Sequence, residues 1–88
     1  MYYVITHHFV KNNVKEEDMI PHVEYLRQLF SDGKLLITGP FTDKKQGGMF
    51  IVEVEDESEL QKIIENDPAV KNGISVSEAR PYKIFLKK

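Results

Sequence analysis

The chain has 88 residues, a formal net charge of −2 at pH 7 and a hydrophobic fraction of 41%, values typical of one globular domain, here spanning residues 1–88. It contains no cysteine, which excludes disulfide scaffolds, cysteine-ligated zinc and thiol catalysis. The acidic balance argues against non-specific nucleic-acid binding, and no apolar run approaches the roughly 18 residues of a membrane span. The N-terminal residues lack the pattern of a secretory signal, so we expect a cytoplasmic protein that binds neither nucleic acid nor membrane.

The first part of the chain predicts a strand, a helix and a second strand. Met1–Val10 is rich in Tyr, Val, Ile and Thr, and both of its alternating faces carry apolar groups, as in a central strand. A helix is expected over roughly Glu17–Asp32, because apolar residues recur there at three- and four-residue spacing. Gly33 follows at the position that commonly ends a helix. Lys34–Phe41 is expected as a second strand.

A polar turn, a third strand and a second helix are expected next. Thr42–Gly47 has turn composition, and Gly48–Glu55 alternates apolar side chains as a strand does. Asp56, with Glu59 three positions later, opens a helix in a capping-box-like pattern. That helix ends at Asp67-Pro68, because the residue before a proline is pushed out of the α region.

The last part of the chain predicts a connector and a final strand. Ala69–Gly73 is expected as a short connector, and Ile74–Phe85 alternates as a strand. Pro81 lies within this strand and lacks a backbone donor, which favours a position at the edge of the sheet.

The order strand, helix, strand, strand, helix, strand predicts an α+β fold of the ferredoxin-like βαββαβ type. Two helices would cover one face of a four-stranded antiparallel sheet with the spatial order 4-1-3-2. The opposite face would then expose Met49 and Ile51, and an exposed apolar patch of this kind usually marks a contact. We therefore expect a homodimer that packs two open sheet faces together; a monomer with a tolerably apolar face is the alternative.

This topology brings a histidine and an aspartate to the same end of the domain. His22 lies in the first turn of the first helix, and Asp67 lies just past the end of the neighbouring antiparallel helix. A carboxylate that accepts one ring N–H would fix the imidazole tautomer and raise the basicity of the other nitrogen. The alternative for His22 alone is a partly buried histidine that is hydrogen-bonded to the backbone. The alternative for Asp67 alone is an aspartate that only ends a helix.

Further residues at this end are candidates for substrate binding: His7, Gly39, Pro40 and Gly48. At most one of His7 and His8 can join His22, because adjacent strand residues point to opposite faces. Glycine would let a ligand approach the backbone, although it is also ordinary in turns. Imidazole and carboxylate suit zinc, iron or manganese, but the spacing of His7, His22 and Asp67 matches no metal motif. We therefore expect neither a metal nor another cofactor.

The run from His22 to Pro40 resembles the YCII-related domain, the YciI-like proteins. It has a histidine, a helix that ends in glycine and a leucine-rich strand that closes with Gly39-Pro40. Other short motifs follow in the family's order: Gly47-Gly48, Asp67-Pro68, Gly73 and Pro81. Members often carry an acidic residue near the end of the first strand, where this chain has histidines instead.

The resemblance implies a ferredoxin-like, dimeric α/β-barrel fold and an active site built on a His–Asp pair, which falls here on His22 and Asp67. One characterised branch of the family eliminates chloride from a chlorinated hydroxyquinol.

Three functions are compatible with these residues. The first is a small cofactor-free enzyme of lyase or hydrolase type, in which His22, oriented by Asp67, acts as general acid/base on a small aromatic or hydroxylated substrate. The second is a non-catalytic dimer that binds a small metabolite in the same cleft. The third is a structural dimerisation domain in which the His–Asp contact only ties two helices together.

Overall fold

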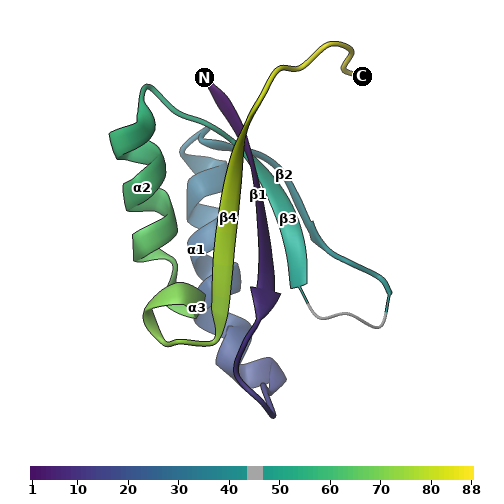
Figure 1. The fold of residues 1–88 in the computed structure, drawn as a ribbon, viewed down its shortest axis with the longest axis vertical. Coiled ribbons are helices and arrows are strands. Elements are labelled where there is room, and N and C mark those ends of the chain that lie inside the picture. The colour runs from purple at the N-terminus through teal and green to yellow at the C-terminus, as the bar shows by residue number, and fades with distance from the viewer. Residues whose placement is uncertain (44–46) are drawn as a thin grey trace.

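The computed structural model describes residues 1–43 and 47–88. Within them an antiparallel sheet has four strands: β1 (Tyr2–Phe9), β2 (Leu35–Pro40), β3 (Gly47–Glu53) and β4 (Ser75–Tyr82). Three α-helices accompany the sheet: α1 (Ile20–Ser31), α2 (Glu57–Asn66) and α3 (Pro68–Lys71). A short 3-10 helix, η1 (Glu16–Met19), leads into α1. All the helices lie on one face of the sheet (Figure 1).

The strand order is β2-β3-β1-β4, which confirms the predicted order 4-1-3-2 read from the opposite edge. β1 is central and pairs antiparallel with both β3 and β4, so that Ile5 lies opposite Phe50 on one side and Ala79 on the other. Pro81 lies in the edge strand β4, as its missing donor predicts. The fold is thus α+β with the ferredoxin-like arrangement.

The core lies between the sheet and the helices. Alternate residues of β1 and β3 point into it, and Ile5, Phe50 and Val52 are at most 1% exposed. Helix α1 contributes Leu26 and Leu29 to the same cluster, while α2 adds Leu60 and Ile63. Burial of these apolar side chains is the main force that holds the helix layer on the sheet.

Pro21, Gly33 and Asp56 act at the ends of the long helices as their residue types predict. Pro21 lies in the first turn of α1, where a missing backbone donor is harmless. After α1, Gly33 adopts φ +76°, and the amides of Gly33 and Lys34 bond back to the last turn at 3.1 and 3.0 Å, a Schellman end. In α2 the side chain of Asp56 accepts the Glu59 amide at 2.9 Å.

The strands match the expected ranges to within one or two residues, except at the end of the last strand, and three differences are larger. The α-helix begins at Ile20 and not at Glu17, because the acidic residues before it form the tighter η1 turn. The predicted connector Ala69–Gly73 contains α3, which starts at Pro68 directly after Asp67. The last strand ends at Tyr82, which pairs with Tyr2, the first residue of β1. Residues 44–46 of the predicted turn lie outside the described residues.

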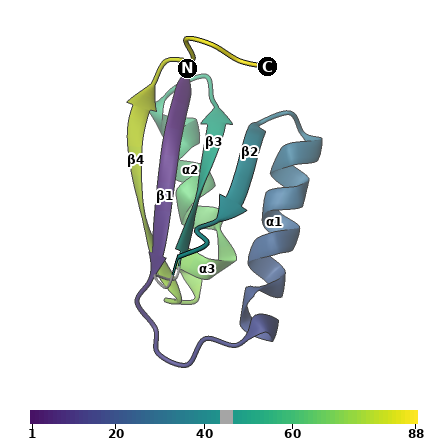
Figure 2. The ribbon, with the colours of Figure 1, turned by 90° about the vertical axis from the view of Figure 1, so that its right-hand side faces the viewer.

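The second face of the sheet carries no helix among the described residues (Figure 2). Val4, Met49 and Ile51 lie on it and are only half-buried. Within the described ranges no helix is long and apolar enough to cross a membrane. The cytoplasmic location stays a prediction.

Candidate active site

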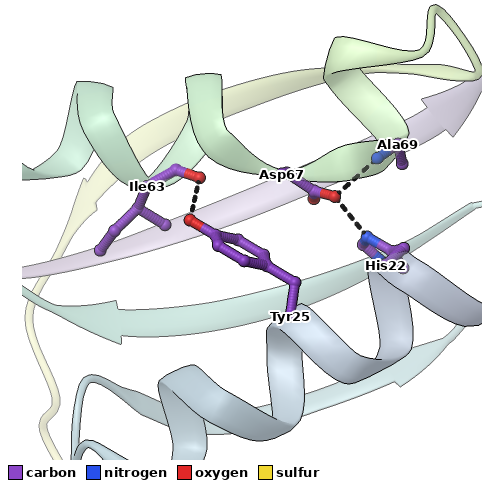
Figure 3. A network of polar contacts seen from close by, with 5 residues as sticks. All are labelled: His22, Tyr25, Ile63, Asp67 and Ala69. Atoms are coloured by element: carbon purple, nitrogen blue, oxygen red, sulfur yellow. Dashed lines mark hydrogen bonds and ion pairs between the residues drawn. The ribbon is translucent and has the colours of Figure 1, made fainter.

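The end of β1 meets the first turn of α1 and the junction of α2 with α3. His22 is the third residue of α1, and Asp67 is the single residue between α2 and α3. The Nδ1 of His22 lies 2.7 Å from Oδ1 of Asp67, and the same oxygen accepts the Ala69 amide at 2.9 Å. Figure 3 shows both bonds converging on this oxygen from two helices. Asp67 is therefore held by its role as the N-cap of α3 and in turn orients His22.

The pair is withdrawn from solvent. His22 is 4% exposed and Asp67 is 2% exposed. A carboxylate can only accept hydrogen bonds, so the ring nitrogen that faces it, Nδ1, carries the hydrogen. The other ring nitrogen, Nε2, then keeps its lone pair and is the atom of His22 that can take a proton.

A second cross-link fixes α1 against α2. The hydroxyl of Tyr25 donates to the carbonyl of Ile63 at 2.7 Å (Figure 3). That carbonyl belongs to the last turn of α2, where backbone carbonyl groups have no N–H partner within the helix. Burial, assisted by the charge of Asp67, raises the pKa of Tyr25 to about 12. Tyr25 therefore keeps its hydrogen and acts as a fixed donor one turn along α1 from His22.

His7 at the end of β1 stands beside the pair. It is 8% exposed, and its ring centroid lies 5.1 Å from that of His22. Its Nδ1 has no hydrogen-bond partner among the described residues. Burial, and after it the proximity of His22, lowers the pKa of His7 below its ordinary value, against a weaker opposing effect of Asp67. His7 is thus a neutral imidazole near neutral pH, while His8 is exposed on the far side of the sheet.

Gly48 makes room for His7. A Cβ on Gly48 would lie 2.6 Å from the carbonyl oxygen of Gly39 and 3.0 Å from Nε2 of His7. Only glycine lets β2, β3 and the imidazole approach this closely.

A cavity of about 800 Å³ opens in front of the two histidines. This volume is in the range of small-molecule sites, roughly 300–1,000 Å³. The wall combines α1 and the residue before it with the ends of the neighbouring strands: His7, Phe9, Met19, His22, Val23, Leu26, Arg27, Phe30, Ser31, Leu35, Thr38, Gly39, Pro40 and Gly47. It is mostly apolar, with few polar groups, as ligand sites commonly are.

The predicted site residues fall into two groups. His7, His22, Gly39 and Pro40 line the cavity itself. Asp67 lies behind His22, and Gly48 lies beneath His7, so neither of them is part of the cavity wall. Gly48 therefore supports His7 from outside the cavity, and its neighbour Gly47 lines the cavity together with Gly39.

Sequence reasoning missed the outer wall of the cavity. Val23, Arg27 and Phe30 line it from α1, and their spacing of four and three residues puts them on one side of the helix. This stripe was visible in the sequence beside the buried stripe of His22 and Leu26. Among the described residues, no cluster of three or more His, Asp or Glu side chains could hold a metal ion.

Comparison with known proteins assigns the chain to a family. The family model of the YCII-related domain matches residues 1–85. The chain belongs to the YCII-related domain family. A relative of this YCII-related chain is the uncharacterized protein YjpA of Bacillus subtilis (strain 168), which is 30% identical over 69 residues, 78% of this chain and 80% of YjpA.

Two solved structures have folds similar to that of this chain. One is 5-chloro-2-hydroxyhydroquinone dehydrochlorinase (TftG) of Burkholderia phenoliruptrix AC1100 in complex with 2,5-dihydroxybenzoquinone, with a TM-score of 0.79, 26% identity and 94% of each chain covered. The other is an antibiotic biosynthesis monooxygenase, with a TM-score of 0.59 and 17% identity over 96% of this chain and 100% of that one. The second likeness concerns the fold alone.

Proposed function

We propose that this protein is a small enzyme in which His22, oriented by Asp67, is the general acid/base for a small hydroxylated aromatic substrate. The observation that carries the proposal is the buried 2.7 Å contact between His22 Nδ1 and Asp67 Oδ1, with His22 at the wall of a cavity of about 800 Å³. A supported imidazole next to a ligand-sized space is the arrangement that proton transfer requires.

The chemistry follows from the tautomer of His22. With Nδ1–H donated to Asp67, Nε2 accepts a proton from a substrate hydroxyl, and the resulting imidazolium is stabilised by the carboxylate behind it. In an elimination from an aromatic ring, the electron pair of the broken O–H bond forms a carbonyl, and the ring carbon that bears the leaving group takes up the proton from Nε2. Deprotonation of a second hydroxyl by Nε2 then forms a second carbonyl, and the leaving group departs with its bonding pair. The proton on Nε2 then returns to solvent or to the departing group. Proton transfer of this kind typically contributes about 10²–10⁴-fold.

The substrate class is supported by the likeness to the TftG dehydrochlorinase, whose structure holds 2,5-dihydroxybenzoquinone. A single ring of that size fits a cavity of about 800 Å³. We assign substrate contacts to His7, Gly39 and Pro40, which line the cavity next to His22. Gly48 contributes through its close contact with His7. No cofactor is part of the proposed step.

We also propose that the protein acts as a homodimer. The sheet face opposite the helices carries the half-buried Val4, Met49 and Ile51, together with Ile37 and Tyr82, which are 57% and 48% exposed. A second copy that packs its own sheet on this face would bury this apolar surface.

The test separates catalysis from binding and from a structural role. We would assay loss of chloride from 5-chloro-2-hydroxyhydroquinone, binding of 2,5-dihydroxybenzoquinone, and thermal unfolding, each for His22→Gln and for His8→Gln as the matched histidine control. The proposal predicts that His22→Gln lowers turnover at least about 100-fold, with a small change in the melting temperature, and that His8→Gln does not.

The other outcomes reject catalysis. If His22→Gln weakens binding and the wild type turns over no hydroxylated aromatic compound, the protein is a metabolite-binding module. If the substitution only lowers the melting temperature, the His–Asp contact has a structural role alone.

A further inference from the structure

The charge of the cavity wall is opposite in sign to that of the chain. The whole chain has a formal charge of −2. Among the described residues that line the cavity, Arg27 is permanently charged, His7 and His22 are basic, and none is an aspartate or glutamate. The carboxylate of Asp67 lies behind His22 and is occupied by two hydrogen bonds. A ligand in the cavity thus meets cationic and neutral groups.

Arg27 lies where it can reach a ligand. It follows Val23 by four residues and precedes Phe30 by three on α1, and all three side chains line the cavity. Its side chain is exposed, and no carboxylate among the described residues forms an ion pair with it. Guanidinium groups bind carboxylates and similar planar oxygen anions with two parallel hydrogen bonds. An anion that binds Arg27 therefore displaces no carboxylate of the described residues.

His7 offers a second polar contact deeper in the cavity. It is 8% exposed, and its buried Nδ1 has no partner among the described residues. Its side chain lines the cavity, and its ring centroid lies 5.1 Å from that of His22. The cavity therefore has a second imidazole beside His22, as well as Arg27 on α1.

The apolar part of the wall fits a flat ligand. Phe9 comes from the end of β1 and Phe30 from α1, and Leu26, Leu35 and Pro40 also line the cavity. Aromatic and aliphatic walls of this kind take up the faces of a ring. Polar groups at the wall then select among rings by the charge and position of their substituents.

We propose that the cavity selects a small aromatic anion, with its ring against the apolar wall, its negatively charged oxygens bound by Arg27 and a polar substituent directed at His7. This inference rests on the proposed function and narrows its substrate class from hydroxylated aromatic compounds in general to those that carry an ionised oxygen group. Arg27 is the residue that sets this specificity.

A matched pair of ligands tests the charge preference. The probes are 2,5-dihydroxybenzoate and its neutral amide, 2,5-dihydroxybenzamide, which differ in charge and hardly in size. Their dissociation constants would be measured by NMR titration of the whole protein, with the shifts of cavity residues reporting the place of binding. We expect the anion to bind about fivefold more tightly than the amide or better, as one partly exposed charge pair allows.

Variants of the basic residues test the role of Arg27. Arg27→Gln should weaken binding of the benzoate about fivefold and leave the amide unchanged, while Arg27→Lys should keep part of the preference. Lys62→Gln removes the same charge from the exposed side of α2, away from the cavity, and is the matched control. It should leave both affinities unchanged.

Each other result overturns the inference in a distinguishable way. Equal affinities of the two probes at the cavity would reject the anion preference and leave the proposed function standing. A similar loss in Arg27→Gln and Lys62→Gln would reject a specific role of Arg27. If neither probe nor 2,5-dihydroxybenzoquinone bound at the cavity, both the inference and the proposed function would fail.

Discussion

A single carboxylate oxygen of Asp67 links the local fold to the candidate chemistry. It caps the short helix α3 through the Ala69 amide and holds Nδ1 of His22 at the same time. Asp67 is 2% exposed, so its removal leaves the Ala69 amide and the His22 ring without this partner at a buried place. The same residue therefore affects both the stability of the α2–α3 junction and the orientation of the imidazole.

Two substitutions of Asp67 should separate its role as the cap of α3 from its role as the partner of His22. Asp67→Ala removes the cap and leaves a buried N–H unpaired, so we expect a loss of about 2–4 kcal/mol in the free energy of unfolding. Asp67→Asn keeps an oxygen for the cap, and its loss should be about 1 kcal/mol, although it removes the charge that supports the imidazolium. Urea unfolding measures the loss in free energy of unfolding for each variant. Equal losses for the two variants would contradict this account of the cap.

His7 should make the stability of the protein depend on pH. Its pKa is lowered below the value of 6.5 by burial first, and then by His22 and His8 against the opposing effect of Asp67. Below pH 6.5 the unfolded chain binds a proton at His7 that the folded chain does not. The free energy of unfolding should therefore fall as the pH drops from 7.5 through 6.5 toward the folded pKa.

The measurement is urea unfolding between about pH 7.5 and 5.5, a range that brackets the ordinary pKa of histidine. His7→Gln should reduce the slope of stability against pH, whereas His8→Gln should keep it. An unchanged slope in His7→Gln would show that His7 is not the group responsible.

At the scale of elements, the site depends on how closely β2, β3 and β1 approach one another at their common end. Gly48 is in contact with the backbone of β2 and with the ring of His7. Helix α1 is fixed on the other side by the Tyr25 bond to α2 at 2.7 Å. The position of the histidines thus follows from strand register and from one helix–helix contact.

Substitution by alanine should change the free energy of unfolding differently at Gly48 and at Gly39. A Cβ on Gly48 would meet the Gly39 carbonyl at 2.6 Å, whereas a Cβ on Gly39 meets nothing within 4 Å. Gly48→Ala should cost about 1–3 kcal/mol in unfolding free energy through overpacking. Gly39→Ala should cost less than about 1 kcal/mol. Similar losses for both variants would contradict the close packing described here.

The order and pairing of the elements could be predicted from the sequence, because strand alternation, helix periodicity and chirality leave few topologies open. That topology is also what brought His22 and Asp67 to one end of the domain. Helix α3 was missed because four residues show no periodicity. The stripe of Arg27 and Phe30 is visible in the helix pattern, but that pattern does not show that the stripe lines a cavity, because this depends on how α1 packs beside β2.

At the scale of the whole molecule, one layer of helices covers one face of the sheet, and the other face keeps apolar side chains at its surface. Ile37, Val76 and Tyr82 are 57%, 43% and 48% exposed there. The C-terminal segment after β4 runs away from the body of the domain (Figure 1), and Phe85 in it is 88% exposed. This distribution of apolar surface is the basis for the proposed homodimer.

A charge placed on the open face should break the dimer. Light scattering at micromolar concentration should give the mass of two chains for the wild type and of one chain for Ile51→Glu, because a carboxylate would be buried without a partner. Ile20→Glu, on the exposed start of α1, should leave the dimer intact. A wild-type mass of one chain would reject the dimer.

The central claim is that His22 is a base oriented by Asp67 and directed at the cavity, and the ring nitrogens of His22 report on it most directly. We would record their ¹⁵N NMR signals with and without 2,5-dihydroxybenzoquinone, in the wild type and in Asp67→Asn. The account predicts a hydrogen on Nδ1 that Asp67→Asn exposes to exchange, and a shift of Nε2 when the ligand binds. A hydrogen on Nε2 in the free wild type, or ligand binding that leaves Nε2 unshifted, would contradict it.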